Sequence, residues 1–254
     1  MKRLSAFVFF VVLTLDPGLA KNNGVSTYGI ATKGQFPSSA IIYNYSTRGT
    51  HFCGGTLINE FYVITTATCV QDALRFNVSL GTSALISADT VTVFAVHYMV
   101  HPDFDPQTLD YNIGIIQLFQ PVIYTEYIRA AYLATVKLPD DFSGVGVSWG
   151  SFSDGSGISL NYANVSTISK EECKMRYGKL LSDSMVCVVS NDDEAFCKGS
   201  TGSPLLSVLS NEHQWIMGIA SFSATIGTCT SYNPLIYARL FPALDWVKEV
   251  AGIE

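Results

Sequence analysis

The sequence predicts an all-β protein, built as a sandwich or a barrel. After the first twenty residues the chain contains many short apolar stretches rich in Val, Ile, Thr, Tyr and Phe, among them 39–43, 62–66, 91–96 and 113–118. Clusters of Gly, Pro, Asn and Ser separate these stretches at intervals of about ten residues, which is typical of short antiparallel strands joined by turns.

One stretch near the end of the chain has clear helical spacing. In residues 241–250 the apolar side chains of Leu244, Trp246, Val247 and Val250 recur on one face of a helix, which predicts a short amphipathic closing helix. No repeat, low-complexity tract or long linker divides the 254 residues. We therefore expect one domain over residues 25–254.

The charge of the chain excludes a nucleic-acid partner. Only 14% of the residues are charged and the net charge is −6, so the basic footprint of a nucleic-acid-binding surface is missing. No block of like charge suggests an electrostatic tail.

The first twenty residues predict a secretory signal peptide. Lys2 and Arg3 form its positive region, residues 6–15 its apolar run, and Gly18 to Ala20 the small residues that cleavage requires. An apolar run of about ten residues is too short for the alternative, a membrane anchor. We expect a secreted, extracellular protein with no membrane association and a short extension at 21–24.

Six cysteines agree with secretion, because an even number in a secreted chain indicates disulfides. The competing interpretation is a zinc site, but no two cysteines lie two to four residues apart as zinc ligands do. We expect neither a metal nor another cofactor. Three Asn-x-Ser sequons, at Asn44, Asn77 and Asn164, are candidate glycosylation sites.

Residues 197–205, CKGSTGSPL, resemble the nucleophile loop of trypsin- and chymotrypsin-like serine proteases, C-x-G-D-S-G-G-P-L. Other landmarks of this family follow in the right order over nearly all of the mature chain: GQFP at 34–37, as in insect members, HFCGGTLI at 51–58, WG at 149–150, SDGSGIS at 153–159 and YARL at 237–240. The resemblance implies two six-stranded antiparallel barrels, a cleft between them and a closing helix.

The same resemblance implies that the catalytic residues have been replaced. VITTATC at 63–69 resembles V-L-T-A-A-H-C, which puts Thr68 in the position of the histidine. Asn112 stands where the family has its aspartate, and Thr201 where it has its serine. Ser200 replaces the aspartate that orders the oxyanion loop. A hydroxyl needs a neighbouring base to become a nucleophile, and Thr68 is no base at neutral pH.

The positions that shape the primary specificity pocket in this family are also altered. Ala195 and Phe196 occupy its base, and Ser223 and Leu235 stand where its walls carry glycine. Side chains at wall positions obstruct entry, the bulky Leu235 most of all. We expect a closed pocket. Packing of Phe196 and Leu235 in the core is the alternative, and it has the same consequence.

Activation by cleavage is not expected either. Active members are cut after a basic residue, whereas the junction here is Gly24-Val25, and Ser200 offers no carboxylate to the new amino group. From the resemblance we expect three disulfides, namely Cys53–Cys69, Cys173–Cys187 and Cys197–Cys229.

No other residue is expected to restore the site. His51 has a counterpart in many active relatives, and His101-Pro102 resembles a surface turn of the family. His97 and His101 are four residues apart, but they lie in strand and turn, so we do not expect a metal site. We expect Asp110 to be a solvated loop residue, displaced from Asn112 by about 7 Å along the strand.

The leading hypothesis is a secreted, catalytically inactive serine protease homologue of insect type that works as a monomer by binding a protein. Loops on a disulfide-linked scaffold can form such a binding surface. A weak hydrolase with an atypical site and a secretory structural protein are the alternatives.

Overall fold

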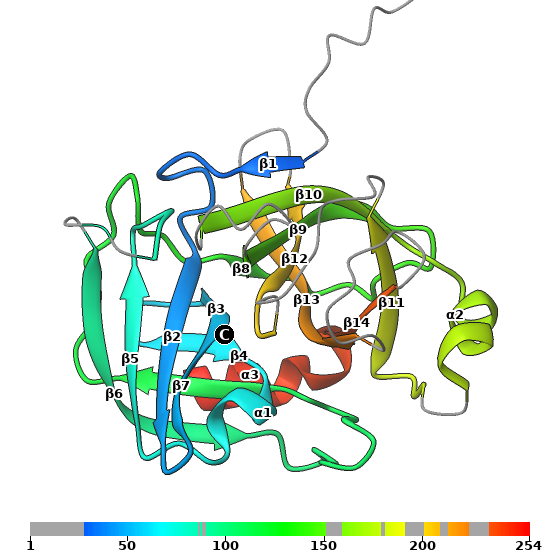
Figure 1. Ribbon diagram of the computed structural model, residues 1–254, viewed down its shortest axis with the longest axis horizontal. Coiled ribbons are helices and arrows are strands. Elements are labelled where there is room, and N and C mark those ends of the chain that lie inside the picture. The colour runs from blue at the N-terminus through cyan, green and yellow to red at the C-terminus, as the bar shows by residue number, and fades with distance from the viewer. Residues whose placement is uncertain are drawn as a thin grey trace, which may run out of the picture.

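Two antiparallel barrels lie side by side in the computed structural model, which describes residues 28–85, 87, 90–150, 159–178, 181–190, 201–208, 213–223 and 234–254 (Figure 1). The first barrel closes in the order β2-β3-β4-β7-β6-β5. Its strands are β2 (Ser39–Ser46), β3 (Gly49–Leu57), β4 (Tyr62–Thr65), β5 (Arg75–Leu80), β6 (Val91–Val100) and β7 (Gly114–Leu118).

The second barrel closes in the order β9-β10-β11-β14-β13-β12, with β12 pairing back to β9. Its strands are β9 (Ser143–Gly150), β10 (Ser159–Thr167), β11 (Met185–Ser190), β12 (Pro204–Val208), β13 (Gln214–Ser223) and β14 (Leu235–Arg239). Short β1 (Tyr28–Ile30) joins β10 from outside, and β8 (Tyr132–Leu133) runs parallel to β13. The all-β prediction and the two barrels implied by the family resemblance are therefore confirmed.

The core explains why alternating stretches became strands. Along β10 buried and half-buried residues alternate almost throughout, as expected for a strand with one face in a barrel. One buried cluster is shared by the two barrels: Ile41 and Ile113 of the first barrel belong to it together with Trp149 and Ile216 of the second. Burial of these large apolar side chains holds the barrels together, and the candidate site lies at their junction.

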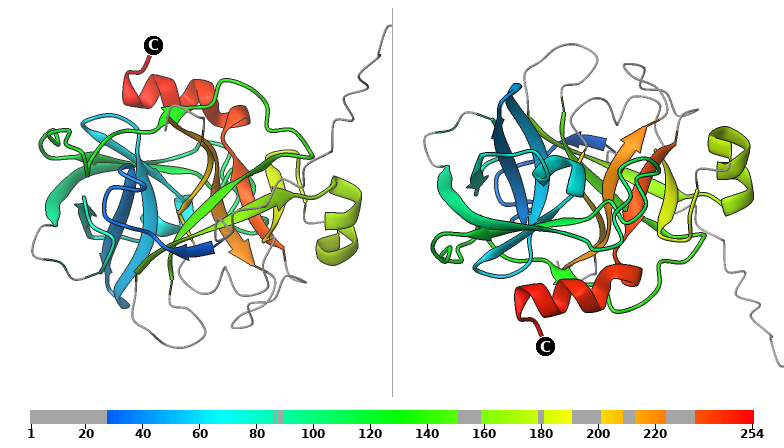
Figure 2. Two further views of the ribbon diagram at one scale, coloured as in Figure 1. Left: turned by 90° about the horizontal axis from the view of Figure 1, so that it is seen from above. Right: turned by 90° about the horizontal axis from the view of Figure 1, so that it is seen from below.

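Three short helices accompany the barrels: α1 (Ala67–Val70), α2 (Lys170–Tyr177) and α3 (Leu244–Ala251), the last preceded by the 3-10 turn η2 (Phe241–Ala243). The predicted closing helix is therefore present, with a tighter first turn. Both views in Figure 2 show α3 on the periphery. Its end contacts the first barrel, because Asn59 Nδ2 donates to the Ala251 carbonyl at 2.9 Å. No helix in the described ranges is long and apolar enough to cross a membrane.

Helix α2 was not predicted, because its mostly polar sequence KEECKMRY has no apolar periodicity. Local interactions maintain it instead. The Ser169 side chain accepts a hydrogen bond from the Glu172 amide as an N-cap, and the Cys173–Cys187 disulfide joins the helix to β11. One N-cap hydrogen bond and one disulfide thus stabilise this helix, and a hydrophobic pattern predicts neither of them.

His101 is buried, so the expectation of a surface turn is wrong for its side chain. The imidazole is 6% exposed and stacks on Tyr111 at 4.6 Å between ring centroids, with the Trp246 ring of α3 edge-on at 4.8 Å. Burial lowers the pKa of His101 below 6.5, although Asp103 and Asp110 act in the opposite direction. The ring therefore serves packing between the first barrel and α3.

We predict that His101→Phe weakens the acid sensitivity of the fold. The unfolded chain takes up a proton near pH 6.5, and the buried ring resists it. His101 therefore leaves stability intact above that pH and lowers it as the pH falls. Thermal unfolding between about pH 7.5 and 5.5 should show a smaller loss of melting temperature in the variant than in the wild type. His97→Gln, at an exposed histidine, is the matched control; equal acid sensitivity in all three proteins contradicts the prediction.

Candidate functional site

The fold brings Thr68 and Asn112 into direct contact. Thr68 lies on the one-turn helix α1, which the buried strand β4 carries to the barrel junction, and its side chain is exposed. The Thr68 amide donates to Asn112 Oδ1 at 3.0 Å, and its hydroxyl donates to Thr66 Oγ1 at 3.2 Å. The two residues aligned with histidine and aspartate therefore remain neighbours, joined by uncharged hydrogen bonds.

Asn112 is completely buried and both ends of its amide are engaged. Besides accepting from Thr68, it donates through Nδ2 to Ser221 Oγ of β13 at 2.8 Å. A carboxylate can only accept hydrogen bonds, whereas this amide both accepts from Thr68 of the first barrel and donates to Ser221 of the second. The buried polar groups of Asn112 are thus satisfied without any charge.

Ser221 is a site residue that sequence reasoning missed as a partner of Asn112. It lies 109 residues away in the chain, and its side chain is 6% exposed. The signal available was its place in the stretch Ser221-Phe222-Ser223, which was interpreted only for the pocket wall at Ser223. A contact between two barrels leaves no spacing pattern in the sequence.

The loop before Asn112 is held in an unusual backbone conformation. Leu109 and Tyr111 have φ of 60° and 46°, in the left-handed region that residues other than glycine rarely adopt. Asp110 between them accepts hydrogen bonds from the hydroxyls of Ser182, at 2.6 Å, and of Ser184, and from the Tyr111 amide at 3.0 Å. The expectation of a solvated Asp110 is therefore wrong. This residue fastens the loop to the second barrel, which gives its carboxylate a structural role.

Thr201 is anchored to the first barrel through its backbone. Its carbonyl accepts from the Gly54 amide at 2.8 Å, and Gly54 follows Cys53, whose disulfide partner Cys69 follows Thr68. The backbone of Thr201 is thus hydrogen-bonded to the segment 53–54, and the Cys53–Cys69 disulfide links that segment to the residue after Thr68. The Cys53–Cys69 and Cys173–Cys187 disulfides are both present as expected, while Cys197 and Cys229 lie outside the described residues.

Gly202 permits this close approach. Its φ is +86°, and a Cβ there would lie 2.2 Å from the Gly54 carbonyl oxygen and 2.3 Å from Thr65 Oγ1. Ser203, which departs from the family's glycine, fills the space beside Gly54, where an added Cβ would meet its hydroxyl at 2.0 Å. The Ser203 hydroxyl is buried and has no hydrogen-bond partner among the described residues. Only two glycines facing each other leave room for this loop.

No imidazole replaces the missing base in the residues that the structure describes. All four histidines are among them, and no hydrogen bond or ring contact there joins one to Thr68, Asn112 or Thr201. His51 is exposed on β3 opposite Asn44, His97 is exposed on β6 opposite Gln117, and His213 packs against Tyr132. No cluster of three or more His, Cys, Asp or Glu suited to a metal ion occurs in the same ranges.

The structure describes only part of the predicted pocket. Ala195, Phe196 and Ser200 lie outside the described residues, and only the backbone of Ser223 is described. Leu235 is directly opposite Ser223 in the β13–β14 pairing, and its half-buried side chain packs against the barrel cluster that contains Val188 and Tyr237. The two predicted wall positions are therefore neighbours in the sheet. Closure of the pocket stays a prediction.

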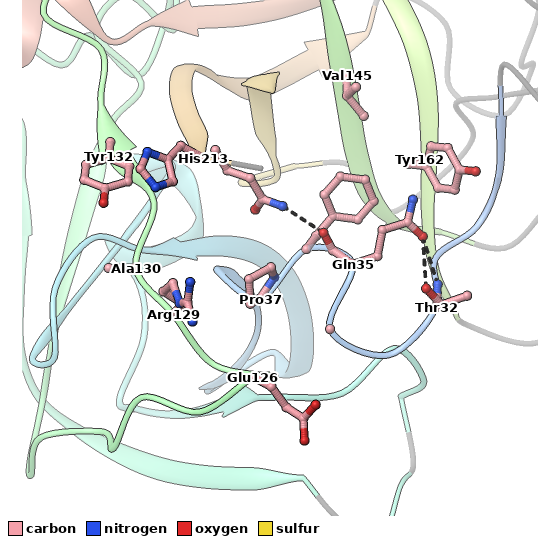
Figure 3. A pocket seen from close by; sticks show the side chains of 13 residues that line it. Thr32, Gln35, Pro37, Glu126, Arg129, Ala130, Tyr132, Val145, Tyr162 and His213 are labelled. Atoms are coloured by element: carbon pink, nitrogen blue, oxygen red, sulfur yellow. Dashed lines mark hydrogen bonds between the residues drawn. The ribbon is translucent and has the colours of Figure 1, made fainter. Parts of the chain in front are cut away.

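A separate hollow of about 640 Å³ lies between the segment 32–37, the inter-barrel connection 126–132 and the strands β9, β10 and β13 (Figure 3). We call it the Tyr162 hollow. Its lining includes neither Thr68, Asn112 nor Thr201. Gln214 fixes its floor by donating to the Gln35 carbonyl at 2.8 Å, while Gln214 Oε1 accepts from the Ser38 hydroxyl at 3.3 Å.

Comparison with known proteins places this chain in one family. The family model described as Trypsin matches residues 29–247. The chain is 32% identical over 213 residues to brachyurin of Leptuca pugilator, covering 80% of this chain and 89% of that protein. This chain belongs to the trypsin family.

Two further matches are more distant. Transmembrane protease serine 9 of Rattus norvegicus is 27% identical over 227 residues; the match covers 85% of this chain and 21% of that much longer protein. The solved structure of neuropsin, described as a serine protease expressed in the limbic system of mouse brain, superposes with a TM-score of 0.76 at 21% identity, covering 88% of this chain and 98% of its own. At that identity the structural match supports the fold alone.

We predict that Gly202→Ala strongly destabilises the protein. The new Cβ adds the strain of a positive φ to a clash with the Gly54 carbonyl, together about 3 kcal/mol in the free energy of unfolding. Gly252→Ala is the matched control, because Gly252 has φ +63° but nothing within 4 Å, and it should cost only about 1 kcal/mol. Denaturant unfolding measures both, and equal losses would refute the close-packing argument.

Proposed function

We propose that this trypsin-family chain is a secreted, non-catalytic homologue that acts by binding another protein, as a decoy, adaptor or modulator of proteolytic cascades. The observation that carries the proposal is the environment of Asn112. Its buried amide is satisfied by the Thr68 amide and the Ser221 hydroxyl, both neutral. These contacts support a site organised without an imidazolium.

The chemistry of hydroxyl nucleophiles supports the same proposal. A threonine or serine hydroxyl attacks a carbonyl only when a base removes its proton, and a carboxylate orients that base. Thr68 has a hydroxyl where the base belongs, and Asn112 lacks the charge that stabilises an imidazolium. No histidine contact described above brings another base to Thr201. We therefore infer that Thr201 is not activated.

The named activities of the relatives give the alternative. Transmembrane protease serine 9 and neuropsin are both called proteases, and a weak hydrolase with an atypical site would retain part of that activity. A protein whose secretory fold alone matters is the third possibility. We favour binding, because the chain retains the barrel core and two of the disulfides that hold its loops in place. We also propose that the chain is of insect type, because residues 34–37 resemble the corresponding segment of insect members of the family.

We predict that the purified chain hydrolyses neither peptide nor ester substrates and that a fluorophosphonate probe leaves Thr201 unlabelled. Sites that keep their oxyanion hole retain about 10³–10⁴-fold catalysis over water after loss of triad members. Because Ser200 replaces the aspartate that orders the oxyanion loop, we expect part of this residual catalysis to be lost as well. An active trypsin assayed in parallel is the control. Stoichiometric labelling of Thr201 would establish the hydrolase alternative.

The triple variant Thr68→His, Asn112→Asp, Thr201→Ser extends this experiment. We expect it to stay a poor protease, because the side chains of Leu235 and Phe196 should still obstruct the pocket, and Ser200 has no carboxylate to anchor a new amino terminus. Turnover comparable to trypsin would show that the pocket and the oxyanion hole had been preserved.

We predict that partner binding does not require cleavage at Gly24-Val25. The junction lacks a basic residue, and Ser200 lacks the carboxylate that holds the new amino group in active relatives. Affinity capture from the fluid that contains the native protein should recover the same partner with the intact secreted chain and with a chain engineered to begin at Val25. Capture by the cut form alone would reveal a zymogen-like switch, and capture by neither would favour a structural protein.

A further inference from the structure

The three sequons differ in how their side-chain nitrogens are used. Asn44 is only 7% exposed, and its Nδ2 donates to the Cys69 carbonyl at 2.6 Å. Asn77 is half-buried and donates to the Tyr45 hydroxyl at 3.4 Å. Asn164 is half-buried like Asn77, but its side-chain amide makes no hydrogen bond to any described residue. A glycan is attached through this nitrogen and is bulky, so the fold argues against Asn44 and favours Asn164.

Asn164 lies at the margin of the Tyr162 hollow. In the β9–β10 pairing it is directly opposite Val145, and Tyr162 is two residues before it on the same face of β10. Directly paired side chains have Cβ atoms about 5 Å apart, and alternate residues of a strand about 7 Å apart. Val145 and Tyr162 both line the hollow. Whatever is attached to Asn164 therefore begins at its edge.

The lining of the hollow suits a saccharide. Its volume of about 640 Å³ is in the range of small-molecule sites. Figure 3 shows Tyr132 and His213 on one side of it and Val145 and Tyr162 on the other. Aromatic faces of this kind pack against the apolar C–H face of a sugar ring, and a polar group at the ring's edge fixes its orientation.

Unused hydrogen-bond donors line the same hollow. The Arg129 guanidinium is exposed and forms no ion pair or hydrogen bond with the described residues, although Glu126 also lines the hollow. Gln35 Oε1 accepts from the Thr32 amide at 3.0 Å, and the NH₂ group of Gln35 donates to no described residue. Sugar hydroxyl and acetamide oxygens are acceptors for such groups. The hollow thus offers donors beside aromatic surfaces.

We propose that Asn164 carries an N-linked glycan and that its first sugar residues lie in the Tyr162 hollow, against Tyr162 and within reach of Arg129. Attachment requires a lipid-linked oligosaccharide pyrophosphate as donor and passage through the secretory pathway. The Asn164 nitrogen forms a bond to the anomeric carbon and loses a proton. The bond from that carbon to the pyrophosphate oxygen breaks, and the leaving pyrophosphate keeps the electron pair. The glycan then covers a surface remote from Thr68, independently of whether the chain binds a protein.

Site occupancy is tested on the full chain secreted from eukaryotic cells. Peptide N-glycosidase applied to the denatured protein converts each glycan-bearing Asn to Asp, which peptide mass mapping detects. We expect conversion at Asn164 and none at Asn44. Ser166→Ala removes the sequon but keeps Asn164, so this variant should lose the corresponding glycan mass. Recovery of unmodified Asn164 from the wild type, or modification of Asn44, overturns the assignment.

Docking of the glycan is tested on the native protein. An endoglycosidase that cuts between the first two sugars should act about tenfold faster on Arg129→Ala than on the wild type, because one hydrogen bond to a charged group is lost. Arg48→Ala, at another exposed arginine, is the matched control and should leave the rate unchanged. Equal rates for the wild type and Arg129→Ala contradict docking.

Hydrogen exchange gives a second readout that needs no substitution in the lining of the Tyr162 hollow. Amides of the segment 32–37, which borders the hollow, should exchange more slowly in the glycosylated wild type than in Ser166→Ala. The amides of α3, far from the hollow, are the internal control. Identical exchange in the segment 32–37 would mean that the glycan extends into solvent, and docking would be rejected.

Discussion

The close contact between Gly54 and Gly202 is the constraint on which the site depends. The Gly54 amide donates to the Thr201 carbonyl, and the Thr65 hydroxyl donates to the Gly54 carbonyl at 2.8 Å, so the two peptide groups that flank the Gly54 Cα are both held. No side chain fits between these backbones, and Gly202 needs its positive φ to turn away. The loop that carries Thr201 can keep this position only while both residues stay glycine.

The polar network behind this contact orders the candidate site through neutral hydrogen bonds alone. Removing one member of a buried charged group leaves its partners unsatisfied, which is costly. Here Thr68 and Asn112 replace the charged pair together. The side-chain amide of Asn112 accepts from the Thr68 amide and donates to the Ser221 hydroxyl, and both bonds are neutral. The buried side chain of Asn112 therefore has its hydrogen bonds satisfied without a charge, beside the exposed Thr68.

The same barrels also form the Tyr162 hollow, a second surface with polar groups that could bind a ligand. Around the Tyr162 hollow, Gln214 and Gln35 tie the first residues of the domain to β13, while the Arg129 guanidinium is exposed. The two regions share the inter-barrel core but no lining residue. A surface role of the Tyr162 hollow is therefore independent of the residues at the candidate site.

The sequence by itself determined the fold class and indicated the candidate site. Short apolar stretches separated by turn residues predicted strands, and motifs in the right order indicated the family. The positions of Thr68, Asn112 and Thr201 followed from those motifs. These features are local, because each motif is contiguous in the chain. The expected disulfides Cys53–Cys69 and Cys173–Cys187 followed from the resemblance for the same reason.

Only the tertiary structure decided which distant residues complete the site. Ser221 meets Asn112 across 109 residues, and Ser182 and Ser184 fix Asp110 across more than 70, contacts that no periodicity encodes. His101 became a buried ring because Tyr111 and the far end of the chain close over it. The three sequons look alike in the sequence, yet burial and hydrogen bonding separate Asn44 from Asn164. Strand register and barrel closure set these distances, and both depend on the packing of the whole chain.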